Sequence, residues 1–260
     1  GTLAVDLPAG PLWRFDEGSE LLVDLRDGTL ASISDSALLA GGNALAVEAA
    51  PGEWEILQAG TVELVSPGRY GLTHLLRGQR GTEQAMGDPA PAGAAVVILT
   101  DALRPLPVAL DQIGAARHVR VGPASEGAFG DHVTATSFTP EGRGLRPFAP
   151  VHPRALRLAS GDIEIRWTRR SRDPSADSWT LTEAPMVEDA ETYDLEIRYG
   201  TGAVVRTIEG LTAPAFTWTA AMQTADLGAA ASEVRLRAWQ IGALGRGAPL
   251  EATVQITEAT

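Results

Sequence analysis

Cysteine and lysine are both absent from this chain of 260 residues. Without cysteine there can be no disulfide, no thiolate zinc site and no cysteine nucleophile. All 21 basic residues are therefore arginines, and asparagine occurs only at Asn43 while alanine is abundant. Because lysine and asparagine codons are rich in A and T, we interpret this bias as the mark of a GC-rich genome rather than as a functional choice.

Long apolar runs are missing as well. No stretch of 18 apolar residues exists, so no membrane span is expected. The first residues lack the charged start and apolar centre of a signal peptide. Because the chain begins at Gly1 rather than at a methionine, we expect a fragment or a processed product. The net charge of −12 disfavours nucleic-acid binding, since an acidic surface repels the phosphate backbone.

What the chain does contain is typical of folded β proteins. Its length suggests one large or two ordinary domains, each able to bury a core. The 28 glycines and 17 prolines indicate many turns. These features favour an all-β fold.

The hydrophobic pattern of the first half has mainly period two, which predicts strands. In residues 20–26, Leu21, Val23 and Leu25 share one face, and residues 94–101 form a continuous apolar run that predicts a buried strand. Further strands are predicted at residues 53–58, 62–64, 117–121 and 132–138. Two short helices are predicted, at 34–42 with Asp35 or Ser36 as N-cap and Gly41 as stop, and at 219–230 with Thr219 as N-cap and Gly228 as stop.

The second half shows a clearer alternation after a segment rich in proline and glycine. We place a domain boundary near residues 149–153, which divides the chain into a β-rich domain at 1–150 and a second domain at 151–260. Strands are predicted in the second domain at residues 162–170, 192–200, 203–211, 215–220, 233–241 and 250–257. About seven short strands in this length predict a β-sandwich.

This second domain resembles a fibronectin type III-like domain. Trp167 matches the core tryptophan of that family's second strand. The family's tyrosine on the penultimate strand is missing, so we expect Leu236 or Trp239 to fill its space.

The segment HLLRGQRGTE, residues 74–83, places two arginines among glycines and could suggest a phosphate loop. The phosphate-binding patterns need a lysine or a long helix after the glycines, and neither is present. We therefore interpret the segment as a strand that enters a glycine turn, with Leu75 or Leu76 in the core. We expect Arg77 and Arg80 to tie neighbouring segments together and Glu83 to offset the charge of Arg80.

Catalytic and metal sites find little support. His74, His118, His132 and His152 are scattered without metal-ligand spacing. The segment around Ser125 lacks the nucleophile-elbow spacing. The carboxylates of Glu53 and Glu55, and the cluster Glu188, Asp189 and Glu191, are more typical of solvated surface than of a glycosidase pair. We predict no catalytic residue, no metal and no cofactor.

Tryptophans outside an obvious core could form a sugar-binding platform. Trp13, Trp54, Trp179 and Trp218 are of this kind. Aromatic residues on β-sandwiches are more often core or protein-interface residues.

Several motifs resemble one family along nearly the whole chain. The pattern G-x-W-E-x-[IL]-Q, a tyrosine strand and L-L-R-G-x-R-G-T-[ED] are followed by W-x-R-R in the second domain. They are similar to the C-terminal part of the baseplate or tail-tip protein of phage-like gene transfer agents, also called host specificity protein. The matching residues are Trp54, Glu55, Tyr70, Leu75, Leu76, Arg77, Gly78, Arg80, Gly81, Thr82, Glu83, Trp167, Arg169 and Arg170.

The resemblance implies a virion structural protein at a tail tip, assembled in the bacterial cytoplasm and acting outside the cell. It also implies a homotrimer that contacts hub and fibre proteins and the recipient envelope. The family's hydrolase-like barrel would lie upstream, so we expect no enzyme activity in this chain. Two other functions stay open, namely a carbohydrate-binding module for host-surface polysaccharide and accessory domains of a glycoside hydrolase.

Overall fold

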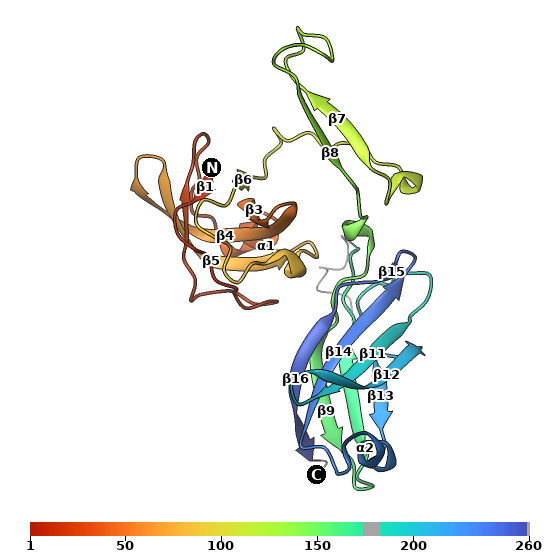
Figure 1. Ribbon diagram of the computed structural model, residues 1–260. Helices are drawn as coiled ribbons and strands as arrows, with labels where there is room; N and C mark the ends of the chain where they lie inside the picture. The colour runs from red at the N-terminus through yellow and green to blue at the C-terminus, as the bar shows by residue number, and fades with distance from the viewer. Residues whose placement is uncertain (174–182, 259–260) are drawn as a thin grey trace.

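The computed structural model describes residues 1–173 and 183–258, and it is mostly β, as the sequence predicts (Figure 1). Figure 1 shows two compact β bodies, one in the first hundred residues and one after residue 150, with a separate hairpin between them in sequence. No helix among the described residues has the length and apolar character needed to cross a membrane.

The first body is a six-stranded antiparallel sheet in the order β1-β2-β5-β4-β3-β6. A short helix and a 3-10 turn accompany it. The elements are β1 (Thr2–Leu3), β2 (Leu21–Asp24), α1 (Asp35–Leu39), β3 (Ala44–Ala50), β4 (Glu53–Ser66), β5 (Arg69–Gln79), η1 (Glu83–Ala85) and β6 (Val96–Ile98).

The core of this body forms where the period-two pattern places it. Leu21 and Val23 of β2 are fully buried, and Leu25 packs against the same cluster. The predicted strands at 53–58 and 62–64 are one long strand, β4. The predicted buried strand at 94–101 is shorter and lies at the sheet edge, where only Val96 is buried. Its continuous apolar pattern did not distinguish an edge strand from a central one.

Residues 99–148 leave this body and return as a hairpin, which we call the arm. Among the described residues its strands pair only with each other, in a two-stranded sheet of their own. The elements are η2 (Leu110–Gln112), β7 (Arg117–Val121), β8 (Thr134–Phe138) and η3 (Arg143–Leu145).

The second body begins at the predicted boundary. Its strands follow the order β12-β11-β14-β16-β9-β10-β13, with β15 on β14, and β16 pairs β9 in parallel. The elements are β9 (Val151–Arg157), β10 (Ile163–Thr168), β11 (Tyr193–Tyr199), β12 (Ala203–Leu211), β13 (Ala215–Trp218), α2 (Ala220–Leu227), β14 (Glu233–Gly242), β15 (Gly245–Arg246) and β16 (Leu250–Glu258).

Its core contains the residues that the alternation predicts. Trp167 is buried and meets Tyr193 edge to face at 5.5 Å between ring centroids. Leu236 and Trp239 are both buried, at 2% and 6% exposure. Burial, followed by the hydrogen bond to Glu191, raises the pKa of the Tyr193 hydroxyl far above its usual range.

The helix ends test the capping predictions. In α2, the hydroxyl of Thr219 accepts from the backbone N–H of Met222, and Gly228 ends the helix at φ 76°, both as predicted. In α1 the N-cap is Ser34, which accepts from Ala37, so the predicted Asp35 or Ser36 is wrong by one or two positions.

Candidate interaction site at the domain junction

The two motifs singled out in the sequence lie on either side of the contact between the two bodies. In the first, β4 and β5 are hydrogen-bonded neighbours, which brings Glu55 and Arg77 together inside the sheet. Arg77 Nε donates to Glu55 Oε1 at 2.7 Å, and Nη2 donates to Oε2 at 2.8 Å. Both side chains are fully buried. The strand predicted at residues 53–58 is present, but the expectation of a solvated Glu55 is wrong, because a guanidinium neutralises this carboxylate inside the sheet.

Other groups complete the surroundings of Arg77. Its Nη1 donates to the carbonyl of Pro8 at 3.1 Å, and Glu55 also accepts from the N–H of Gly78 at 3.0 Å. Asp16 Oδ2 lies 3.7 Å from Arg77 Nη1, buried and without a hydrogen-bond partner among the described residues. Every polar group that can bind Arg77 is thus internal, so this arginine holds the sheet and presents nothing to solvent.

The glycine turn after β5 is held by hydrogen bonds between the Thr82 hydroxyl and nearby backbone groups. Thr82 Oγ1 donates to the carbonyl of Gln79 at 2.7 Å and accepts from the N–H of Ile56 at 2.8 Å. Gly81 has φ 78°, and a β-carbon there would lie 2.9 Å from the ring of Phe148 in the segment that leads to β9. A glycine is therefore required twice over, for its backbone angle and for the close approach of the second body.

Glu83, directly after this turn, makes the main polar contact between the bodies. Arg170 Nη1 donates to Glu83 Oε1 at 2.6 Å, joining residues 87 positions apart. The Glu83 side chain is 5% exposed and that of Arg170 is 26% exposed. The guanidinium also lies over the ring of Phe148 at 5.0 Å and near that of Trp13 at 6.0 Å. We call this set of residues, Trp13, Glu83, Phe148 and Arg170, the junction latch.

A second, weaker link lies nearby. Arg143 of η3 donates to both carboxylate oxygens of Glu53 in β4, at 3.0 and 3.3 Å. These hydrogen bonds raise the pKa of the Arg143 guanidinium above its usual value. Both side chains are more than a third exposed, so this pair contributes little to stability.

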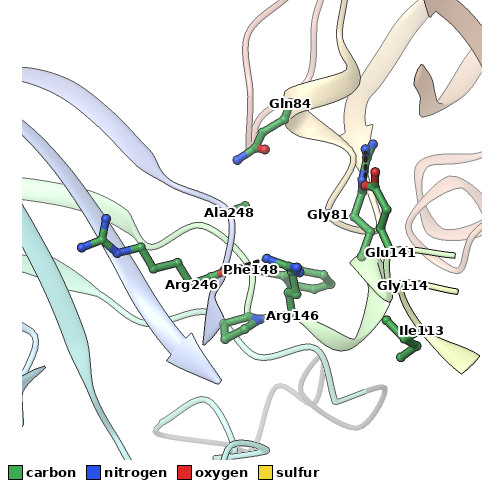
Figure 2. A pocket seen from close by; sticks show the side chains of 12 residues that line it. Gly81, Gln84, Ile113, Gly114, Glu141, Arg146, Phe148, Arg246 and Ala248 are labelled. Atoms are coloured by element: carbon green, nitrogen blue, oxygen red, sulfur yellow. Dashed lines mark hydrogen bonds and ion pairs between the residues drawn. The ribbon is translucent and has the colours of Figure 1, made fainter. Parts of the chain in front are cut away.

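A cleft of about 480 Å³ lies beside the latch. Figure 2 shows that three parts of the chain line it: the turn at Gly81 and Gln84, the base of the arm, and the second body near Ala248. Arg146 is the cation least engaged there, since its only side-chain hydrogen bond among the described residues is from Nη1 to the carbonyl of Arg246 at 3.3 Å.

The structure places the remaining motif residues in structural roles. Arg169 does not reach the junction, since it donates to the carbonyl of Pro185 at 2.9 Å. Leu75 is fully buried and Leu76 is half-buried, while Tyr70 is buried at 8% exposure. Trp54 is half-buried on the outer face of β4.

Arg80 differs from the expectation. It is exposed, has φ 57°, and makes no hydrogen bond or ion pair with any residue in the described part of the chain. The expected partner, Glu83, is instead engaged by Arg170. The sequence could not show this, because the competing arginine comes from the other domain.

The tryptophans proposed for sugar binding are also placed differently. Trp218 is buried at 1% exposure, and its Nε1 donates to Asp226 at 2.8 Å, so it belongs to the core. Trp13 is 41% exposed, and its Nε1 lies 3.5 Å from Glu83 in the latch. Trp179 lies outside the described residues.

The polar candidates for chemistry are dispersed. Glu55 is the partner of Arg77, and Glu188 pairs with Arg172 at 2.9 Å. Ser125 lies in the exposed turn of the arm. Among the described residues, no three His, Asp or Glu side chains form a group that could hold a metal ion.

Comparison with known proteins bears on the first body. No curated protein matches the chain. Residues 1–97 match the family described as "Rcc01698-like, C-terminal". The match spans the six-stranded sheet and ends within β6, before the arm begins, so it includes the Glu83 side of the latch and excludes the Arg170 side. Residues 1–97 are therefore similar to the C-terminal domain of that family.

Proposed function

We propose that this chain is a structural and interaction module of a phage-like tail tip or baseplate, in a host-recognition or DNA-delivery particle of the gene transfer agent type. The similarity of residues 1–97 to the Rcc01698-like C-terminal domain supports this proposal. The resemblance of the second-domain motif at Trp167, Arg169 and Arg170, which lies outside the matched residues, supports it further. In this role the second body acts as a fibronectin type III-like domain, and no catalytic step is assigned to the chain.

The observation that carries the proposal is the junction latch. Motif residues from both domains meet there, Glu83 from the first and Arg170 from the second. A buried or half-buried ion pair packed on an aromatic ring fixes the angle between two rigid β bodies. Fixing an angle is what a component of a symmetric assembly needs, since its contacts on both sides must be satisfied at once.

The partners follow from this role. We propose a homotrimer that contacts hub and fibre proteins at the tail tip, with the recipient envelope as the surface finally reached. The exposed guanidinium of Arg80 and that of Arg146, which makes one hydrogen bond among the described residues, lie beside the latch and are available to such neighbours. Guanidinium groups suit protein interfaces because they bind carboxylates in a bidentate manner with a modest hydration cost.

The decisive experiment locates the chain in a particle. A tagged copy is expressed in the bacterium that encodes it, particles are purified on a density gradient, and the tag is located by immunogold electron microscopy. We expect the label at one end of the tail. An untagged strain gives the background. Absence of the chain from purified particles would contradict the proposal. If the chain is absent from particles and also releases heat when titrated with host polysaccharide, the carbohydrate-binding function is favoured instead.

A further inference from the structure

The cleft beside the junction latch contains an arginine whose capacity to donate hydrogen bonds is mostly unused. The guanidinium of Arg146 carries five N–H donors, and only Nη1 makes a hydrogen bond among the described residues. Most arginines of the chain pair with a carboxylate, and of those without an ion pair among the described residues all except Arg117 and Arg146 are exposed. A half-buried cation without a countercharge is costly, so Arg146 marks a place for an anion from outside the chain.

The other two arginines that line the cleft are already engaged. Arg143 donates to both carboxylate oxygens of Glu53. Arg246 donates to Asp194 at 2.7 Å, and its guanidinium lies over the ring of Trp239 at 4.5 Å. Figure 2 shows the side chain of Arg246 pointing away from the cleft, whereas that of Arg146 lies in the middle of it. Arg146 therefore supplies the free donors that face the cleft.

The walls around this guanidinium are largely apolar. Ile113 comes from the base of the arm, Pro147 and Phe148 from the connecting segment, and Ala248 from the second body. Gln84 is exposed, and its side-chain amide makes no hydrogen bond with any residue in the described part of the chain. Binding sites in proteins commonly combine apolar walls with a few polar groups that fix the orientation of the ligand, and the volume of about 480 Å³ is in their range.

Charge favours a carboxylate over a phosphate as the anion. Glu141 also lines the cleft, 3.4 Å from Arg143, so a dianion would meet this carboxylate with one free guanidinium to offset the repulsion. A carboxylate carries a single charge and matches the planar fork of one guanidinium. Nucleic acid is disfavoured further, because the net charge of −12 repels its backbone.

We propose that this cleft binds an acidic peptide segment of another protein. One Asp or Glu side chain of the segment pairs with Arg146, and a neighbouring apolar side chain packs against Phe148 and Ile113. A bound segment would contact both bodies and the base of the arm, because all three line the cleft. The inference rests on the proposed function only in taking the segment to come from a neighbouring tail protein.

The first test titrates the purified full chain with a panel of capped pentapeptides, Gly-Xaa-Glu-Xaa-Gly, in which Xaa is Ala, Val, Leu or Phe. A matched panel has Gln in place of Glu, and isothermal calorimetry measures the affinities. We expect the best Glu peptide to bind at least about tenfold more tightly than its Gln counterpart, and this advantage to shrink as salt is added. Equal affinity of the two panels overturns the proposal. So does tighter binding of inorganic phosphate, or binding of propionate as tight as that of the best peptide.

The second test assigns the preference to Arg146. We expect Arg146→Met to lose the preference for Glu over Gln. Arg154→Met should keep it, because Arg154 is exposed on β9, outside the cleft, and has no ion pair among the described residues. Thermal melting verifies that both variants are folded. A folded Arg146→Met protein that keeps the wild-type preference overturns the proposal.

A charge reversal separates recognition from a merely structural role. We expect Arg146→Glu to bind peptides with a central Arg about tenfold more tightly than those with a central Glu, since the variant carries the opposite charge in the cleft. A loss of fold cannot produce this reversal, and an unchanged preference for Glu overturns the proposal. These titrations use the chain alone, so their failure leaves the location of the chain in particles untouched, and its absence from particles leaves the peptide result standing.

Discussion

Arg170 Nη1 donates a hydrogen bond of 2.6 Å to Glu83 Oε1 across the junction of two domains, although the two residues are 87 positions apart in the chain. The aromatic ring of Phe148 lies under the same guanidinium at 5.0 Å, in the segment that connects the arm to the second body. One ion pair thus holds the first domain, the connecting segment and the second domain at a single point.

Removing the latch should loosen the junction without unfolding either body. We expect Arg170→Ala to increase the rate of proteolysis in the connecting segment around residues 146–150 and to broaden the solution scattering profile. A charge-assisted hydrogen bond of this kind contributes about 1.5–3 kcal/mol. Arg166→Ala is the matched control, since Arg166 is exposed on β10 and forms an ion pair with Glu164 of the same strand. Equal resistance of the two variants to proteolysis would show that the latch does not fix the angle between the two bodies.

The buried pair of Arg77 and Glu55 should be costly to break from one side. We expect Arg77→Met to lower the free energy of unfolding by about 3–5 kcal/mol, because it leaves the buried carboxylate of Glu55 without a countercharge. Urea denaturation followed by circular dichroism measures this. Arg69→Ala removes an ion pair of similar geometry with Asp24 at the surface, and it should change the midpoint only slightly. A large shift of the urea midpoint in Arg69→Ala would mean that burial does not explain the cost of breaking the Arg77–Glu55 pair.

Arg80 and Gly81 are adjacent, both have positive φ, and substitution should affect them in opposite directions. Arg80→Gly relieves a left-handed conformation at an exposed side chain and should stabilise the domain by up to about 1 kcal/mol. Gly81→Ala should destabilise it, because the added carbon meets Phe148. Thermal melting of both variants is the measurement. A lower melting temperature for Arg80→Gly would restore the original expectation that this guanidinium ties segments together.

Asp226 should make stability depend on pH at the acid end. Hydrogen bonds from Arg206, and then from Trp218 Nε1, lower its pKa below the usual 3.8. Because the folded-state pKa lies below the unfolded one, this stabilisation is complete above about pH 4 and is lost as the pH falls through the folded pKa. We expect Asp226→Asn to be less stable than the wild type at pH 7 in urea titrations. The difference between the two proteins should shrink as the pH falls below about 4. A difference that stays constant over this acid range would exclude the linkage.

The sequence predicted the second body better than the first. Strands β10, β11 and β14 alternate large apolar and polar residues, and their inward faces match the core. β3 was missed because its alanines, Ala44, Ala46, Ala49 and Ala50, give little contrast between the faces. Glu55 was assigned to the surface because carboxylates are usually exposed, and Trp218 was placed outside the obvious core. In both cases a specific polar partner made burial possible.

The latch was not predictable from one sequence. Its motifs were identified, but nothing in residues 80–83 shows that Glu83 binds Arg170 rather than Arg80. The choice depends on how two domains dock, and a single sequence does not contain that information. The amphipathic arm was predicted as two strands, yet its lack of a covering surface is visible only in three dimensions.

The parallel pairing of β16 with β9 has a consequence for how the protein is made. Ile256 to Glu258, near the C-terminus, lie beside Ala155 to Arg157, the first strand of the second body. During synthesis β9 therefore keeps one open edge until β16 has left the ribosome. The first body can fold long before β16 is made. A protein cut short before β16 would expose the facing edges of both β9 and β14.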